Sequence, residues 1–92
     1  MLRLAGLEQI SEAGDIPTAE KMARSLLPDL ALVDVMLPGI SGIEGIPRLK
    51  RAAPNMRIVL VSAYHDEFKI YQDSARLAGA EAFISKDELD LE

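Results

Sequence analysis

This chain contains three short apolar runs, and each is followed by a polar residue. The runs are residues 30–33 before Asp34, 58–61 before Ser62, and 80–84 shortly before Lys86. Unbroken apolar runs of this length, rich in Val, Ile and Leu, are typical of strands buried on both faces of a parallel sheet. Glu81 interrupts the third run, and a further short strand is expected at residues 9–12.

Helical patterns lie between these runs. Over residues 18–27 apolar side chains recur at helical spacing, and Pro17 suits the first turn of that helix. A later helix is expected over residues 66–78, because Gly79 stands in a position that commonly ends a helix. The chain therefore alternates between the two kinds of element.

The helix between the first two apolar runs carries its own start signal. Ser41 and Glu44 have the spacing of a capping box, in which the two residues satisfy backbone N–H groups at a helix start. The helix should therefore begin there and run to about Ala52. Pro47 lies inside it and removes one backbone hydrogen bond, unless the helix begins nearer Gly45.

Strands that alternate with helices predict an α/β fold with a parallel sheet, because each crossover helix returns the chain to the same edge of the sheet. The chain has 92 residues, which is enough for one domain, and no repeat or linker divides it. We therefore expect residues 1–92 to form a single domain.

Composition narrows the classes of function. A net charge of −5 with scattered basic residues argues against a nucleic-acid surface, because phosphate backbones are bound by clustered Lys and Arg. The chain has no cysteine, which excludes disulfides and thiolate metal sites. No apolar run is long enough to cross a membrane. We expect a cytoplasmic protein whose segment here contacts neither nucleic acid nor membrane.

Three polar residues would stand at the carboxyl ends of successive strands, where α/β proteins place their sites: Asp34, Ser62 and Lys86. Neighbours in this series are separated by about one strand–helix–strand step, so right-handed crossovers bring all three to one edge. There the carboxylate can attack a phosphoryl group. The Ser62 hydroxyl can donate a hydrogen bond to the new phosphoryl oxygens, and the Lys86 ammonium can neutralise their charge.

Three motifs in this order resemble the signature motifs of response-regulator receiver domains. They are Asp-Val-Met-Leu-Pro-Gly at 34–39, Ser-Ala at 62–63 and Phe-Ile-Ser-Lys at 83–86. Pro-Asp-Leu at 28–30 and Lys-Asp at 86–87 resemble the branch whose regulators carry a helix-turn-helix output domain. The resemblance covers about residues 8–87 and implies a flavodoxin-like fold with strand order 2-1-3-4-5.

This resemblance implies roles for four residues. Asp34 would be the phosphoacceptor, and Ser62 and Lys86 would bind the phosphoryl group. The rotamer of Phe83 would report the state of Ser62, unless Phe83 is an ordinary core residue. A sensor histidine kinase would be the partner, and the switched face would control transcription. As a signalling switch, the chain would not be an enzyme that turns over substrates. Met36 stands where a haloacid-dehalogenase-type phosphatase has a second Asp, which argues against a hydrolase.

The sequence departs from the family pattern at both ends. Residues 1–7 resemble the tail of the first helix, so the first, central strand and its acidic, Mg²⁺-binding pair would be missing. The chain also stops at Glu92, before most of the last helix. Asp34 would then offer a partial metal site, with Glu12 as a candidate substitute ligand. We expect the reading frame to continue upstream of Met1 with the missing strand.

A second interpretation follows from the same departure. Without the acidic pair, the chain would be a phosphorylation-independent interaction module or an inactive truncated receiver. Its apolar sheet faces would be left open, and open apolar faces bind partners or aggregate. A homodimer formed by strand exchange is one such outcome.

Overall fold

A computed structural model describes residues 1–6, 9–62 and 68–85. The strands are β1 (Leu2–Ala5), β2 (Ile10–Ala13), β3 (Leu30–Asp34), β4 (Arg57–Ser62) and β5 (Ala82–Ser85). The helices are α1 (Ile16–Leu26), α2 (Gly42–Ala52) and α3 (Phe68–Ala78). The three strands and three helices expected from the apolar pattern are therefore all present, and β2 lies where a further short strand was expected.

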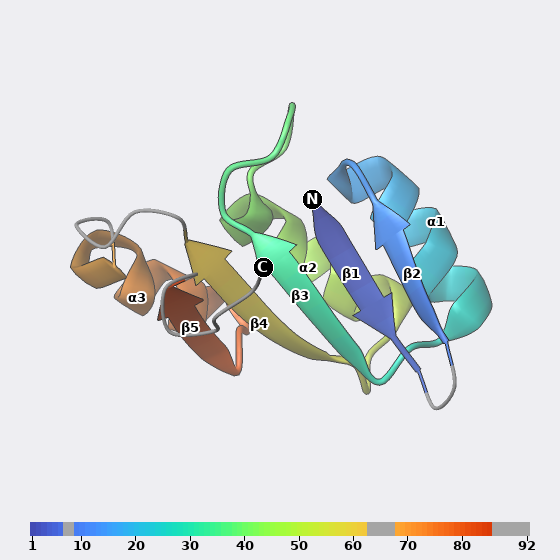
Figure 1. The fold of residues 1–92 in the computed structure, drawn as a ribbon. Coiled ribbons are helices and arrows are strands. Elements are labelled where there is room, and N and C mark those ends of the chain that lie inside the picture. Colours follow the sequence, from blue (N-terminus) through green and yellow to red (C-terminus); the bar gives the residue numbers. More distant parts are fainter. Residues whose placement is uncertain (7–8, 63–67, 86–92) are drawn as a thin grey trace.

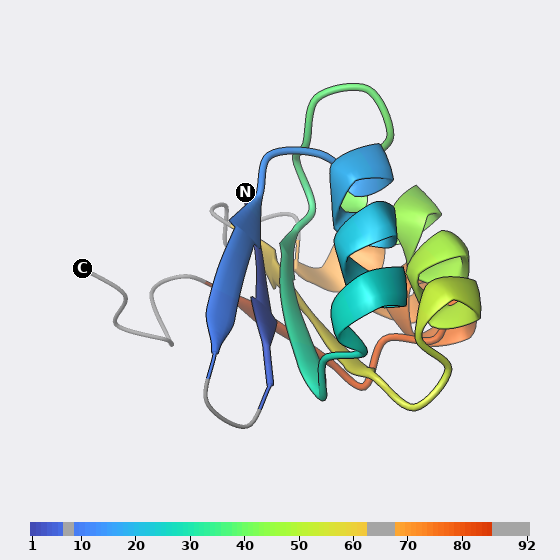
Figure 2. The same cartoon turned by 90° about the vertical axis from the view of Figure 1, so that its right-hand side faces the viewer.

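The strands form one sheet in the order β2-β1-β3-β4-β5 (Figure 1). Strands β3, β4 and β5 are parallel, whereas β1 is antiparallel to both of its neighbours, β2 and β3. All three helices lie on the same side of the sheet (Figure 2). The α/β fold and its 2-1-3-4-5 order are confirmed, although the sheet is mixed rather than wholly parallel.

Strand β1 corrects the expectation for the first seven residues. Residues 2–5 form a strand rather than the tail of a helix, and the central position of the sheet is not vacant, because β1 occupies it. Leu2 and Leu4 are buried while Arg3 between them is exposed, which is the period-two alternation of a strand. Without β1, the facing edges of β2 and β3 would lack these backbone partners.

The start of α2 lies where the capping signal placed it. The N–H of Glu44 donates to the Oγ of Ser41 at 3.1 Å, and the Ser41 hydroxyl donates to the Glu44 carboxylate at 3.3 Å. The helix then runs through Pro47, so a later start near Gly45 is wrong. Packing of the apolar face of α2 outweighs the lost backbone hydrogen bond, since Ile46 is fully buried.

The starts and ends of the other helices also follow local signals. Asp15 caps α1 by accepting a hydrogen bond from the N–H of Thr18 at 2.9 Å, with Pro17 in the first turn. After α3, Gly79 has a φ of 115°, a conformation that favours glycine. Its place after the last turn is the one that the sequence predicted.

One ion pair ties α1 to α2 beside the core. Arg48 of α2 donates from its Nη2 to Glu20 Oε1 at 2.9 Å and from its Nε to Oε2 at 3.4 Å. The hydrogen bond from Arg48 lowers the pKa of the Glu20 carboxyl and raises the pKa of the Arg48 guanidinium. The folded state therefore favours the charged form of Glu20.

Replacing Arg48 by Met should destabilise the protein more at pH 7 than at pH 3. Because the folded-state pKa of Glu20 is lowered, its contribution is fully present above the ordinary glutamate pKa of about 4.3 and is lost as the pH falls through the lowered value. Urea unfolding of both proteins at the two pH values measures this. Equal differences in free energy of unfolding at both pH values would contradict it.

Candidate functional site

Asp34 and Ser62 lie on neighbouring parallel strands at the same edge of the sheet. Asp34 is the last residue of β3 and is paired in register with Val61, which directly precedes Ser62 at the end of β4. Ser62 is in turn paired with Ser85, the last residue of β5. The structure therefore places two of the three predicted residues at the ends of neighbouring strands, in adjacent rows of the register. Lys86 lies outside the described residues.

The two side chains differ in their access to solvent. The side chain of Asp34 is 22% exposed, so an incoming reagent can reach its carboxylate. Ser62 and Ser85 are only 2% and 1% exposed. These low exposed fractions mean that both serines are buried inside the sheet edge, where the paired strands β4 and β5 end side by side. Ser85 was missed from the sequence, although its place in the Phe-Ile-Ser-Lys motif was a signal.

A cation lies directly against the Asp34 carboxylate. The amino-terminal ammonium of Met1 is 3.0 Å from Asp34 Oδ2. This contact arises because β1 is antiparallel to β3, so Leu2 is paired with Val33 and the start of β1 lies at the carboxyl edge of β3. The site therefore has a positive group beside the Asp34 carboxylate, and the acidic pair of the family pattern was not expected in this sequence.

The connection from β3 to α2 holds Asp34 in place. The N–H of Val35 donates to the carbonyl of Val61 at 3.0 Å, which extends the pairing of β3 and β4 beyond Asp34. The N–H of Gly42 then donates to the carbonyl of Val35 at 2.9 Å. Between them, Gly39 turns with a φ of 77°, where glycine meets no steric cost. The backbone on both sides of the carboxylate is thus fixed.

The described residues do not fit a Mg²⁺ site. Within residues 1–6, 9–62 and 68–85, no group of three or more His, Cys, Asp or Glu side chains is placed to hold a metal ion. Glu12 does not approach Asp34, because β1 lies between β2 and β3 and Glu12 pairs with Arg3 at 3.6 Å. The direct pairing of β2 with β3 that would have made Glu12 a substitute ligand does not occur.

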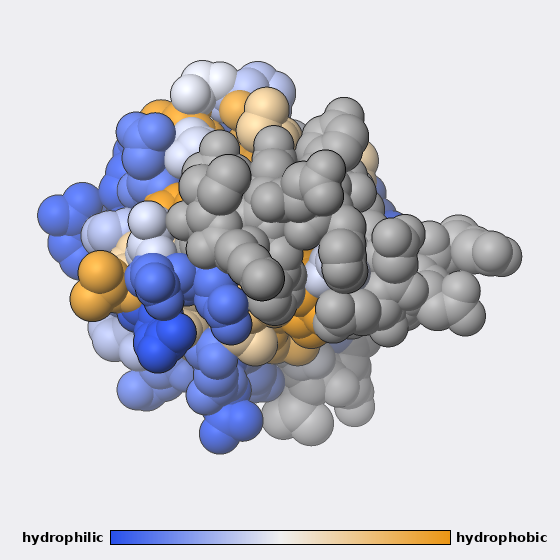
Figure 3. Space-filling view, turned by 90° about the vertical axis from the view of Figure 1, so that its left-hand side faces the viewer, coloured by the Kyte–Doolittle hydropathy of each residue, from blue (hydrophilic) through white to orange (hydrophobic). Residues whose placement is uncertain are grey.

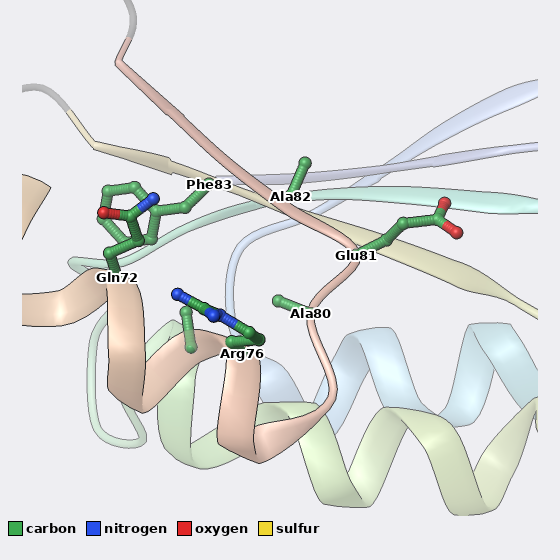
Figure 4. Close-up of a pocket in the computed structure, with 7 residues that line it drawn as sticks. Gln72, Arg76, Ala80, Glu81, Ala82 and Phe83 are labelled. Carbon is green, nitrogen blue, oxygen red and sulfur yellow. The ribbon is translucent and has the colours of Figure 1, made fainter.

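Phe83 packs as a core residue with one side toward a surface hollow. Its side chain is half-buried against the main apolar core. The hollow has a volume of about 150 Å³ and lies between α3 and β5. Figure 4 shows Gln72 and Arg76 of α3 beside Phe83, with Glu81 pointing away from them. The face that Figure 3 shows is hydrophilic over large areas, with smaller apolar patches between them.

Comparison with known proteins identifies the kind of domain. A sequence model described as the response regulator receiver domain matches residues 1–91. The response regulator GacA of Pseudomonas aeruginosa is 31% identical over 83 residues, which are 90% of this chain and 38% of GacA. The DNA-binding transcriptional activator EvgA of Escherichia coli is 34% identical over 82 residues, which are 89% of this chain and 38% of EvgA. The chain thus spans less than half of each relative.

Solved structures agree with these relatives. A response regulator from Burkholderia pseudomallei, crystallised with a phosphorylated aspartic acid, a calcium ion and citrate, superposes with a TM-score of 0.74. It is 25% identical, and the match covers 83% of this chain and 44% of that one. The described part of the chain contains no helix long and apolar enough to span a membrane.

Proposed function

The chain belongs to the response regulator receiver domain family, and from that premise we propose that Asp34 accepts a phosphoryl group from a sensor histidine kinase. The observation that supports this most strongly is the position of its carboxylate. It is partly exposed at the carboxyl end of β3, beside the strand end that carries Ser62. We propose that residues 1–92 act as one cytoplasmic receiver unit.

In the proposed reaction, an Oδ atom of Asp34 attacks the phosphorus of a phosphohistidine on the kinase. The new O–P bond forms as the donor's N–P bond breaks, and the imidazole leaves with the bonding electron pair. The product carries up to two negative charges at the sheet edge. The Met1 ammonium, 3.0 Å from the carboxylate, and Lys86 would offset this charge.

The proposed consequence is a change of partner binding rather than turnover of a substrate. The Ser62 hydroxyl would donate a hydrogen bond to the new phosphoryl oxygens. A resulting shift of Phe83 in β5 would carry the effect of phosphorylation to the surface beside α3. GacA is a response regulator and EvgA is a DNA-binding transcriptional activator. By analogy, we propose that this receiver controls transcription through a partner or an output segment beyond the matched part of these relatives.

Phosphoryl incorporation tests the proposal. Incubation with a small-molecule acyl phosphate and Mg²⁺ should add the mass of one phosphoryl group, detected by intact-mass spectrometry. Hydroxylamine should remove the added group, because it cleaves an acyl phosphate but not a serine phosphate. No adduct, or an adduct that resists hydroxylamine, would contradict the assignment to a carboxylate.

A second candidate function is favoured by one specific observation. Within residues 1–6, 9–62 and 68–85, no group of three or more His, Cys, Asp or Glu side chains is placed to hold a metal ion. This feature suits a receiver that binds its partner without phosphorylation. The same incubation separates the two functions, since this second candidate predicts no adduct at any phosphodonor concentration.

A further inference from the structure

Three arginines gather around one carboxylate where α1 packs against α2. Arg48 donates to both oxygens of Glu20, and Nη2 of Arg24 lies 3.9 Å from Glu20 Oε2. The hydrogen bond from Arg48 is the main cause of the lowered pKa of Glu20, and the charges of Arg24 and Arg51 lower it further. The cluster therefore brings three positive charges to one negative charge.

Arg24 and Arg51 lie one helical turn beyond the Glu20–Arg48 pair, toward the ends of both helices. Arg24 follows Glu20 by four residues on α1, and Arg51 follows Arg48 by three on α2. The two helices end at the same edge of the sheet, because the strands that follow them, β3 and β4, are parallel and in register (Figure 2).

These two arginines keep their hydrogen-bonding capacity. The side chain of Arg24 is 64% exposed, and Arg51 is exposed as well. In the part of the chain that the structure describes, neither guanidinium donates a hydrogen bond to a protein acceptor. Two cations with unused donors thus lie near one another in a chain of net charge −5, which makes this end of the helices a local site for negative charge.

An apolar hollow lies just past the ends of the same two helices. It is lined by residues 27–29, which follow α1, and by residues 53–56, which follow α2. Most of these residues are apolar, and Asp29 is the charged one among them. The volume of the hollow is about 180 Å³, and a cavity of roughly 150 Å³ is enough for one small apolar ring.

Leu27 lines this hollow in a conformation that the fold alone does not favour. Its φ of 46° lies in the left-handed region, where a leucine costs free energy and a glycine does not. Its side chain is 65% exposed, so burial in this chain offsets little of that cost. A strained residue with an exposed apolar side chain points to a contact with a ligand.

We propose that this end of α1 and α2 binds an acidic protein segment that carries an apolar side chain. Carboxylates of the segment accept hydrogen bonds from Arg24 and Arg51, because planar guanidiniums suit carboxylate geometry. The apolar side chain fills the hollow against Leu27. A free phosphate would use the arginines but leave the hollow empty, so the two features together favour the acidic segment.

The proposed site is separate from the candidate phosphorylation site. The hollow lies at the start of β3, whereas Asp34 is the last residue of that strand. The inference therefore goes beyond the proposed phosphoryl transfer and is tested without a phosphodonor.

Titration of the isotope-labelled chain with the end-blocked peptide Glu-Glu-Leu-Glu-Glu, followed by amide chemical shifts, tests this inference. The amides of Arg24, Leu27, Arg51 and Asn55 should shift and saturate, and added salt should weaken binding because it screens exposed charges. Glu-Glu-Ser-Glu-Glu should bind about tenfold more weakly, because serine leaves the hollow unfilled. Lys-Lys-Leu-Lys-Lys should leave these amides unchanged.

Two variants test the two features separately. Arg24→Gln should weaken binding about threefold, as expected for loss of one exposed charge contact. Arg76→Gln is the matched control, because Arg76 is also exposed in the last turn of its helix, α3, and pairs with an acidic residue there. Leu27→Gly should weaken binding about tenfold. It should be no less stable than the wild type in urea, because glycine relieves the left-handed strain.

Three results would overturn the inference. The first is no saturable change at the four amides with Glu-Glu-Leu-Glu-Glu. The second is equal weakening by Arg24→Gln and Arg76→Gln, or unchanged binding by Leu27→Gly. The third is inorganic phosphate that shifts the same amides and binds more tightly than the peptide, which would assign the arginines to a free oxyanion.

Discussion

Asp34→Asn is expected to abolish the phosphoryl adduct and leave the fold intact. The amide keeps the size of the carboxylate but is not a nucleophile toward phosphorus, so incorporation should fall below detection. The substitution also removes the ion pair with the Met1 ammonium. Because that ammonium is exposed, the loss should cost about 1 kcal/mol or less of unfolding free energy. Circular dichroism and intact-mass spectrometry measure the two effects.

Asp29→Asn is the matched control for this substitution. Asp29 is an exposed aspartate directly before β3, at the opposite end of that strand. The backbone N–H of Asp29 donates to the carbonyl of Ala5, and the carbonyl of Asp29 accepts from the N–H of Arg57. Neither hydrogen bond involves the Asp29 side chain. Incorporation should therefore match the wild type. An adduct that persists in Asp34→Asn would assign the phosphoryl group to another residue.

Gly42→Ala is expected to cost about 2–4 kcal/mol of unfolding free energy, which is a large part of the stability of a small domain. A Cβ at position 42 would overlap the carbonyl oxygen of Asp34 and lie 3.0 Å from its carbonyl carbon. It would also lie 3.1 Å from the Cγ1 of Val33. Backbone cannot move aside as a flexible side chain can, so the junction of β3 and α2 must shift.

Gly14→Ala provides the comparison for this prediction. A Cβ at position 14 meets nothing within 4 Å, so the change in stability should stay within about 0.5 kcal/mol. Urea unfolding followed by circular dichroism measures both variants. If Gly42→Ala proved as stable as Gly14→Ala, the close approach of α2 to the end of β3 would be wrong.

Local signals explain why most of the fold could be predicted. Ser41 and Glu44 start α2 through contacts within one helical turn, and the apolar runs that became β3 and β4 are long enough to predict strands, although their second face is only partly buried in β3. Strand β1 could not be predicted in this way. Residues 2–5 are too few to separate a strand from a helix by period, and their conformation depends on pairing with β3, far along the chain.

The candidate site, too, could be predicted from the sequence only in part. Asp34 and Ser62 could be placed at one edge because parallel strands share their carboxyl ends. The contact of Asp34 with the Met1 ammonium could not be foreseen, because it requires the antiparallel direction of β1. The prediction that Glu12 substitutes as a metal ligand was wrong for the same reason, because β1 separates its strand, β2, from β3.

Amide chemical-shift mapping of the isotope-labelled chain, before and after addition of the phosphodonor, tests most directly whether this edge of the sheet receives the phosphoryl group. The largest changes are expected at Val35 and Ser62, which flank the Asp34 carboxylate. Leu30 and Arg57, at the opposite ends of the same two strands, should change little. Changes centred on Leu30 and Arg57, or no change at Ser62 in a phosphorylated chain, would contradict a phosphoryl site at Asp34.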